Sequence, residues 1–261
     1  MLRTRLATAA IALPVVLAVV IFSPNWFFTF FIAVLGAVGL SEVATMTATI
    51  TPAGIFVFVL AGAGPLMGLL SGGAPSWMLP GAVIAAMLVL VGQVAIGDGA
   101  GRFKGLPLAV AGAVYVGVLF PFFALLRNSP HGIPLVMLML LVVIVSDSGA
   151  YFGGSAFGRI KLAPAVSPKK TVEGAVAGLV LAIAAGVILR GWLVPDWTVL
   201  GTAVVSGAIA ILSQLGDLAG SALKRSAGVK DSGWIFPGHG GLLDRACSLV
   251  FAVVFTYYYS R

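Results

Sequence analysis

Long apolar runs separated by short polar segments dominate the pattern of this 261-residue chain. The runs are about 18 residues or longer and do not alternate between polar and apolar positions, which favours membrane-spanning helices over strands. We therefore predict an all-α, polytopic integral membrane protein with about nine transmembrane helices. The predicted spans are Leu6–Phe22 and about 26–47, 52–71, 77–96, 105–126, 133–153, 174–194, 197–222 and 241–259.

The first of these runs follows two basic residues, Arg3 and Arg5, as the apolar core of a signal peptide does. The run ends in Ser-Pro-Asn-Trp-Phe-Phe, which contains no small-x-small cleavage pattern. We therefore expect this run to be a first anchor helix.

The composition agrees with the membrane prediction. Hydrophobic residues make up 60% of the chain and charged residues 9%, which is typical of a polytopic helical membrane protein rather than of a soluble fold. The formal net charge of +7 is explained by basic loops, and no polar domain offers the basic face of a nucleic-acid-binding protein. The single cysteine, Cys247, excludes an intrachain disulfide and a multi-cysteine metal site.

The distribution of basic residues predicts the orientation, because lysine and arginine near helix ends stay on the cytoplasmic side. With a cytoplasmic N-terminus, most of the 15 basic residues fall inside, and Arg245 lies at the inner end of the last span. The inside residues are Arg3, Arg5, Arg102, Lys104, Arg159, Lys161, Lys169, Lys170, Lys224, Arg225 and Lys230, and the outside residues are Arg127, Arg190 and Arg261. We expect a multi-pass protein of the cell membrane whose polar motifs face the cytoplasm.

The chain shows no hydrophilic linker and no internal repeat, so we expect one membrane domain, residues 1–261. Residues 1–104 are interpreted mainly as scaffold helices, because Glu42 is their only acid before Asp98 and their many glycines and alanines permit close helix packing. Residues 105–261 are predicted to hold the catalytic helices and the cytoplasmic motif loops.

A first polar block runs from Ser146 to Gly174. Asp147 in this block follows a mostly apolar run. Aspartate is too short to reach water easily from the edge of the membrane, so a functional role is favoured over a structural one.

The end of this block, Ser-Pro-Lys-Lys-Thr-Val-Glu-Gly, is predicted to start a helix, with Ser167 or Thr171 as the cap and Pro168 in the first turn. Lys169 and Lys170 would then lie beside the amides of a helix N-terminus, where phosphate binds readily. The spacing alone leaves a second interpretation equally open, in which both lysines hold the loop on the cytoplasmic side and contact anionic lipid.

A second polar block, Ser213–Ser248, gathers acids, bases and a histidine in a chain that is otherwise almost uncharged. In a helix, side chains spaced by three or four residues lie on one face. The residues with this spacing are Gln214, Asp217, Ser221 and Lys224. Such a polar stripe at the cytoplasmic end of an apolar helix implies a water-filled cavity.

Asp244 begins the last predicted span, after the turn Pro-Gly-His-Gly-Gly. If Asp217 and Asp244 face each other beside cationic side chains, their two carboxylates form a site with oxygen ligands. Mg²⁺ prefers such ligands and is usually held by one or two carboxylates together with substrate phosphates. Zinc is disfavoured, because the two histidines, His131 and His239, are far apart in sequence.

A cytoplasmic site that holds Mg²⁺ on carboxylates, is surrounded by lysine and arginine and opens to lipid suits a reaction between a phosphate-bearing lipid and a nucleotide. Phosphoryl and nucleotidyl transfer depend mainly on charge neutralisation and in-line positioning. The residues therefore point to an enzyme that acts on a lipid phosphate.

The segment SALKRSAGVKDSGWIFPGHGGLLDR, residues 221–245, closely resembles the signature of the phosphatidate cytidylyltransferase (CDP-diacylglycerol synthase) family. That signature reads S-x-x-K-R, then K-D, then P-x-H-G-G-x-x-D-R. The segments DSGAYF, FGRIKL, SPKKTVEG and QLGDL are also similar to this family. The resemblance covers residues 147–261, and the first half agrees only in hydrophobicity and predicted span count.

The resemblance implies transfer of CMP from CTP to phosphatidate, which yields CDP-diacylglycerol and pyrophosphate. It implies Mg²⁺ as the cofactor, with a second cation as an option, and a homodimer in the membrane lipid. Asp217 and Asp244 would hold the metal, and His239 would bind a phosphate or ease the departure of pyrophosphate. The residues assigned to catalysis are Asp217, Asp244, His239, Lys224 and Arg225.

The resemblance also implies a set of substrate contacts. These residues are Asp147, Lys169, Lys170, Glu173, Ser221, Lys230, Asp231 and Arg245. The acids Asp147 and Glu173 would contact nucleotide or metal, Asp231 would orient Lys230 or its loop, and the basic residues would neutralise phosphates.

Three positions depart from the family pattern. Gly220 and Cys247 stand where the family usually has acids, and Ser155 stands where it usually has arginine. A neutral thiol is a poor ligand for Mg²⁺, so these changes would alter metal affinity or turnover. The alternative interpretation is a non-catalytic or altered-specificity relative that binds or transports phospholipid. A CDP-alcohol phosphotransferase is disfavoured, because its motif D-G-x-x-A-R is absent.

Overall fold

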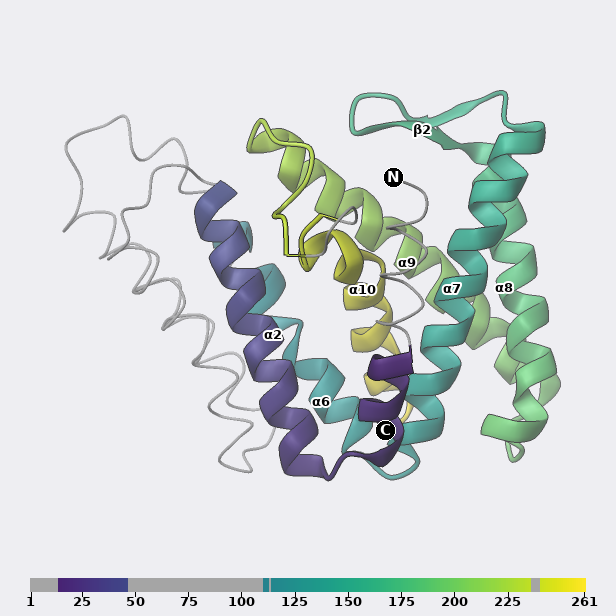
Figure 1. Cartoon of the computed structure of the whole chain (residues 1–261). Coiled ribbons are helices and arrows are strands. Elements are labelled where there is room, and N and C mark those ends of the chain that lie inside the picture. Colours follow the sequence, from purple (N-terminus) through teal and green to yellow (C-terminus); the bar gives the residue numbers. More distant parts are fainter. Residues whose placement is uncertain (1–13, 47–109, 113, 236–239) are drawn as a thin grey trace. The chain divides into compact units, whose positions relative to one another are not determined.

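The computed structural model describes residues 14–46, 110–112, 114–235 and 240–261, which are predominantly helical (Figure 1). The helices bounded within these residues are α2 (Asn25–Met46), the short π-helix η3 (Val114–Val118), α6 (Pro121–Arg127), α7 (Gly132–Phe157), α8 (Val172–Leu193), α9 (Val199–Ser226) and α10 (Leu243–Tyr259). The strands are β1 (Lys161–Ala163) and β2 (Ser167–Thr171).

Five helical segments of the described residues are long and apolar enough to cross a membrane, judged by length and composition. These segments are Asn25–Met46, Val110–Arg127, Gly132–Phe157, Val172–Leu193 and Val199–Ser226. Each overlaps one predicted span, and α10, with 17 residues, overlaps the last one. The prediction of a mainly helical, multi-pass membrane protein is confirmed at this level.

The predicted spans at Leu6–Phe22, 52–71 and 77–96 lie partly or wholly outside the described residues. The count of nine spans therefore stays a prediction, as does the expectation of a single domain.

The chain divides into two compact units. Unit 1 comprises Met1–Leu125 and Leu223–Arg245, and unit 2 comprises Leu126–Ala222 and Ala246–Arg261. Unit 1 thus joins α2 and η3 with the segment that runs from the end of α9 to the first turn of α10. Unit 2 contains α7, the two strands, α8 and most of α9 and α10.

In unit 2, α7 and α8 lie side by side (Figure 1). The buried residues of α8 are all small and recur every four positions: Gly174, Gly178, Ala182 and Gly186. A Cβ on Gly178 would lie 2.5 Å from the carbonyl oxygen of Ser146 in α7. Small residues let two helices approach closely where lipid provides no hydrophobic drive for association, which explains why α8 buries glycine rather than leucine.

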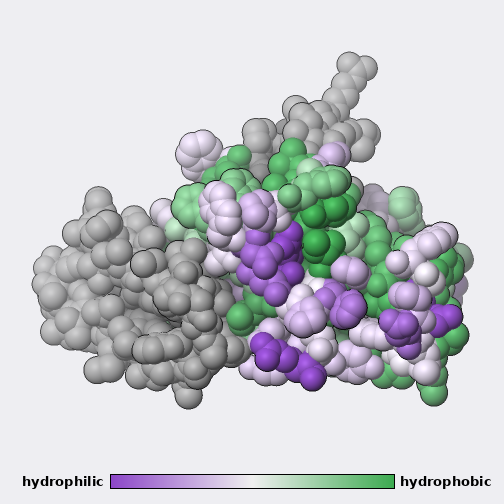
Figure 2. Space-filling model, turned by 90° about the horizontal axis from the view of Figure 1, so that it is seen from below, coloured by the Kyte–Doolittle hydropathy of each residue, from purple (hydrophilic) through white to green (hydrophobic). Residues whose placement is uncertain are grey.

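The outward face of α8 is apolar and large. Its exposed residues include Val176, Val180, Leu181, Ile188 and Trp192. Figure 2 shows that hydrophobic and hydrophilic residues lie side by side on one face of the molecule. A helix that exposes its large apolar side chains and buries its small ones fits a lipid environment.

Strands β1 and β2 form an antiparallel hairpin between α7 and α8 (Figure 1). Thr171 ends β2 and caps α8, because its Oγ1 accepts a hydrogen bond from the amide of Gly174 at 3.2 Å. The predicted cap at Thr171 is confirmed. The alternative with Ser167 as cap and Pro168 in the first turn is wrong, because both residues lie in strand β2 and α8 begins only at Val172.

We expect Gly178→Ala to destabilise the protein by about 1–3 kcal/mol, because the added methyl group would overlap the carbonyl oxygen of Ser146. Gly191→Ala, in the same helix, is the matched control, since nothing lies within 4 Å of the position of its Cβ. Alanine favours a helix over glycine by up to ~1 kcal/mol, so this control should be neutral or slightly stabilised. Thermal unfolding in detergent micelles measures both, and an unchanged Tm for Gly178→Ala would contradict the close packing.

Candidate functional site

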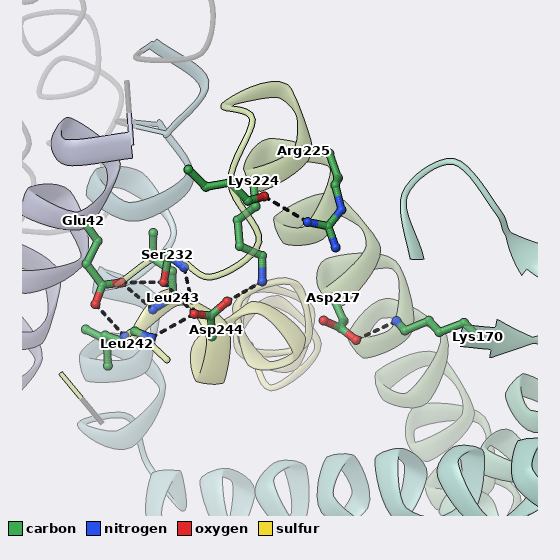
Figure 3. Close-up of polar contacts among 11 residues, drawn as sticks. Glu42, Lys170, Asp217, Lys224, Arg225, Ser232, Leu242, Leu243 and Asp244 are labelled. Carbon is green, nitrogen blue, oxygen red and sulfur yellow. Dashed lines mark hydrogen bonds and ion pairs between the residues drawn. The ribbon is translucent and has the colours of Figure 1, made fainter. Parts of the chain in front are cut away.

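In unit 1, the carboxylate of Asp244 lies in the first turn of α10 and forms an ion pair with Lys224 near the end of α9 (Figure 3). The Asp244 side chain is 4% exposed and the Lys224 side chain 14%. Charges removed from water are tolerated only when they are paired and hydrogen-bonded. The two residues therefore depend on each other.

The two oxygens of Asp244 have different surroundings. Oδ1 faces Lys224. Oδ2 accepts hydrogen bonds from the amides of Ser232 and Gly241, both at 2.9 Å, and the hydroxyl of Ser232 lies 3.1 Å from it. Because a carboxylate oxygen offers about two lone pairs, Oδ2 is fully engaged, whereas Oδ1 retains acceptor capacity beside the lysine.

A second buried carboxylate in unit 1 comes from the first half of the chain. Glu42, near the end of α2, is 4% exposed. It accepts hydrogen bonds from the amides of Leu242 at 2.7 Å and Leu243 at 3.0 Å, and from the hydroxyl of Ser232 at 2.8 Å (Figure 3). Sequence reasoning gave this residue no role. The signal that could have found it was a lone acid in an otherwise uncharged apolar span.

Two glycines make room for the Glu42 carboxylate. A Cβ on Gly241 would lie 2.5 Å from Oε1 and 2.6 Å from Oε2, and a Cβ on Gly233 would lie 2.8 Å from Oε1. Real Cβ atoms do not approach oxygen so closely, so both positions need the missing side chain of glycine. These two glycines of the C-terminal motif thus allow the Glu42 carboxylate of α2 to approach the motif backbone.

In unit 2, a second ion pair joins β2 to α9. The Nζ atom of Lys170 lies 2.6 Å from Oδ2 of Asp217 (Figure 3). The two side chains are 27% and 38% exposed, so this pair remains accessible to solvent and its partners can exchange. One turn earlier on α9, Gln214 donates a hydrogen bond from Nε2 to the carbonyl oxygen of Ala175 at 3.1 Å. The structure therefore brings the first polar block to the second within this unit.

Glu173 has a local partner in the structure. Both of its carboxylate oxygens accept from the amide of Ile160, at 3.1 and 3.2 Å. This contact ties the segment before β1 to the first turn of α8, where an acid also suits the helix dipole. Its contact with nucleotide or metal stays a prediction.

The other predicted site residues make fewer described contacts. Arg225 donates to the carbonyl oxygen of Val229 at 3.0 Å, and Ser221 is partly buried on α9. Arg225 is exposed, and so are Asp147, Lys169, Lys230, Asp231 and Arg245. His239 lies outside the described residues. Their roles stay predictions.

The positions that depart from the family pattern differ in their surroundings. Gly220 is buried on α9, Cys247 is 2% exposed on α10, and Ser155 is exposed on α7. A Cβ on Gly216 would lie 2.4 Å from the carbonyl oxygen of Cys247, so α9 and α10 pack closely there within unit 2. An acid placed at Cys247 would be buried in this packing and would need new hydrogen-bond donors.

The donor chemistry of Asp217 and Asp244 fits a hard divalent cation, because both offer carboxylate oxygens. Each carboxylate contacts a lysine, so a metal ion would share the carboxylate with the ammonium group or displace it. No cluster of three or more His, Cys, Asp or Glu side chains occurs among residues 14–46, 110–112, 114–235 and 240–261. Substrate phosphates would supply further ligands, as is usual for Mg²⁺.

Comparison with known proteins decides the family. The sequence profile of the Cytidylyltransferase family matches residues 3–261. The chain belongs to the Cytidylyltransferase family. This result confirms the resemblance inferred from the motifs and extends it through the first half of the chain.

Curated relatives of this Cytidylyltransferase family chain are named phosphatidate cytidylyltransferase. One from Haemophilus influenzae is 46% identical over 134 residues, which cover 49% of this chain and 46% of the relative. One from Bacillus subtilis is 37% identical over 176 residues, which cover 66% of this chain and 65% of the relative. One from Synechocystis is 41% identical over 166 residues, covering 63% and 54%. The chain thus covers less than two thirds of the length of each of these relatives.

We expect Lys224→Met to destabilise the protein by about 3–5 kcal/mol, because it removes the cation that faces the buried carboxylate of Asp244. Lys230→Met, which removes an exposed charge, is the control and should leave the Tm unchanged.

Thermal unfolding of the double variant Lys224→Met with Asp244→Asn tests the cause. It should be more stable than Lys224→Met alone, because the uncompensated charge is gone. Additive losses in the double variant would show that the two side chains do not interact.

Proposed function

We propose that the chain transfers CMP from CTP to phosphatidate and forms CDP-diacylglycerol and pyrophosphate. The observation that carries the proposal is the match of the Cytidylyltransferase family over residues 3–261. Relatives named phosphatidate cytidylyltransferase support the choice of substrates. The carboxylates and lysines at the ends of apolar helices also suit a reaction at a lipid phosphate.

In this reaction, an oxygen of the phosphatidate phosphate attacks the α-phosphorus of CTP. A new phosphorus–oxygen bond forms, and the bond from the α-phosphorus to the bridging oxygen of the β-phosphate breaks. Pyrophosphate leaves with the electron pair of that bond. Catalysis of such a transfer depends on neutralising the phosphates and holding them in line.

We propose that Mg²⁺ is the cofactor, with a second cation as an option, and that Asp217 and Asp244 are its protein ligands. When bound, the ion would neutralise part of the triphosphate charge. Asp244 would offer Oδ1, because its Oδ2 is engaged by backbone amides. Lys170 and Lys224, now paired with these carboxylates, would turn to the phosphates of the substrates.

The remaining basic residues are suited to wider contacts with the phosphates. Lys169, Lys230 and Arg245 are exposed, as expected of side chains that meet a charged substrate at the surface. His239 and Arg225 keep the roles that the resemblance implies.

We further propose that the chain has nine spans, a cytoplasmic N-terminus and a site on the cytoplasmic face of the cell membrane. The excess of basic residues in the loops that would then be cytoplasmic supports this orientation. The partners would be the two substrates, membrane lipid and a second copy of the chain, and no nucleic acid is expected.

The purified protein in micelles that contain phosphatidate should convert labelled CTP to CDP-lipid and release one pyrophosphate per product when Mg²⁺ is present. Asp217→Asn and Asp244→Asn should each lower the rate by roughly 100-fold or more, because each removes a charged ligand. Asp196→Asn is the matched control, since this acid is exposed in the loop between α8 and α9.

The possible results separate the interpretations. Full activity in both aspartate variants would refute the metal assignment. Phosphatidate binding by the wild-type protein without release of pyrophosphate from CTP would instead support the non-catalytic phospholipid-binding alternative.

A further inference from the structure

Glu42 has an unusual position for an acid. It is the one charged residue of α2, and it is buried. A carboxylate in such a place is costly unless hydrogen-bond donors surround it. Among the residues that the structure describes, the three donors that contact it belong to the C-terminal motif segment, at sequence separations of 190, 200 and 201 residues. The contact therefore links the first half of the chain to the motif.

The start of α10 shows what this contact does. The first amides of a helix have no partner inside the helix and need acceptors from elsewhere. Asp244 reaches back three positions to accept from the amide of Gly241, as the acid of a capping box does. Glycine has no side chain to complete the reciprocal half of that motif. Glu42 does not replace that half, but it accepts from the next two amides, those of Leu242 and Leu243.

Ser232 connects the two carboxylates. Its hydroxyl lies 2.8 Å from Oε2 of Glu42 and 3.1 Å from Oδ2 of Asp244, but it has one hydrogen to donate. If the hydroxyl donates to Glu42, the Ser232 amide still binds Asp244 at 2.9 Å. Glu42 thus holds both backbone segments whose amides hold Oδ2 of Asp244.

We propose that Glu42 is a positioning residue for the reaction. By binding Ser232, Leu242 and Leu243, it fixes the two segments that orient Asp244, so that Oδ1 stays directed toward Lys224 and the reacting phosphates. Glu42 itself contacts no substrate. The inference rests on the proposed function for its effect on rate, but the contact itself can be measured without activity.

The test uses the full chain in detergent with Glu42→Gln, which keeps the shape but places a donor where the carboxylate has only acceptors. We expect kcat to fall by about 10- to 100-fold, with KM for CTP and for phosphatidate changed less than threefold, because misplacement of a reacting group affects mainly the chemical step. Ser41→Ala is the matched control, since Ser41 lies on the same helix and donates only to the carbonyl oxygen of Val38.

A second variant, Ser232→Ala, removes the hydroxyl that contacts the Glu42 carboxylate. It replaces Glu42→Gln as the test variant if that protein does not fold. It should lower kcat by a smaller factor. The double variant should lose less than the product of the two single losses, because both changes break one shared hydrogen bond. Independent losses in the double variant would overturn the proposed connection.

Hydrogen exchange of a peptide that covers residues 240–245 provides the readout that does not need activity. Glu42→Gln should speed exchange there by about tenfold or more, because one of the two acceptor oxygens is replaced by an NH2 group that faces a backbone amide, while peptides of α8 stay unchanged. If the wild-type protein forms no CDP-lipid, the proposed function fails, and the exchange data still decide whether Glu42 holds the segment. Unchanged exchange, or an active wild type with unchanged kcat in Glu42→Gln, would overturn the inference.

Discussion

A carboxylate shielded from water must obtain all its hydrogen bonds from the protein, and in unit 1 this requirement shapes the structure around Asp244. Its partners come from the end of α9, from the segment that contains Ser232, and from the turn before α10. The charge of Asp244 stabilises the arrangement in which these segments meet, because a buried charge without partners costs several kcal/mol.

The ion pair in unit 2 follows different energetics. Lys170 and Asp217 remain partly exposed, and an exposed ion pair contributes about 0–1 kcal/mol to stability. Such a weak interaction is easily exchanged for a phosphate or a metal ion. Unit 1 thus contains a buried carboxylate that several backbone amides hold in place, whereas the carboxylate of Asp217 in unit 2 has a partner that can be replaced.

Much of the architecture was predictable, because a segment that crosses lipid must be a long apolar helix. For the part of the chain that the structure describes, apolar runs predicted the long helices to within about five residues, since only helices satisfy their backbone inside a membrane. The high density of charge in an otherwise apolar chain also pointed to Asp217, Asp244 and their neighbouring lysines. Local spacing could not show which lysine pairs with which aspartate, because those pairs depend on how separate helices pack.

Two features escaped prediction for identifiable reasons. The strand Ser167–Thr171 contains helix-start residues, and only its pairing with Lys161–Ala163 makes it a strand. Glu42 lies in a helix without other charged residues, and two of its donors lie about 200 residues later in the chain. A lone acid in an apolar helix can suggest a special role, but its local sequence does not show which distant residues donate to it.

The wide separation of Glu42 from its donors also has a consequence for biosynthesis. During translation, α2 is complete long before Leu242 and Leu243 leave the ribosome. Glu42 therefore enters the membrane before the residues that donate hydrogen bonds to it have been made. It lies near the end of its helix, where burying an acid costs less than at the centre of the membrane. The segment from Ser232 to Leu243 can therefore adopt its contacts with α2 only after these later residues have been synthesised.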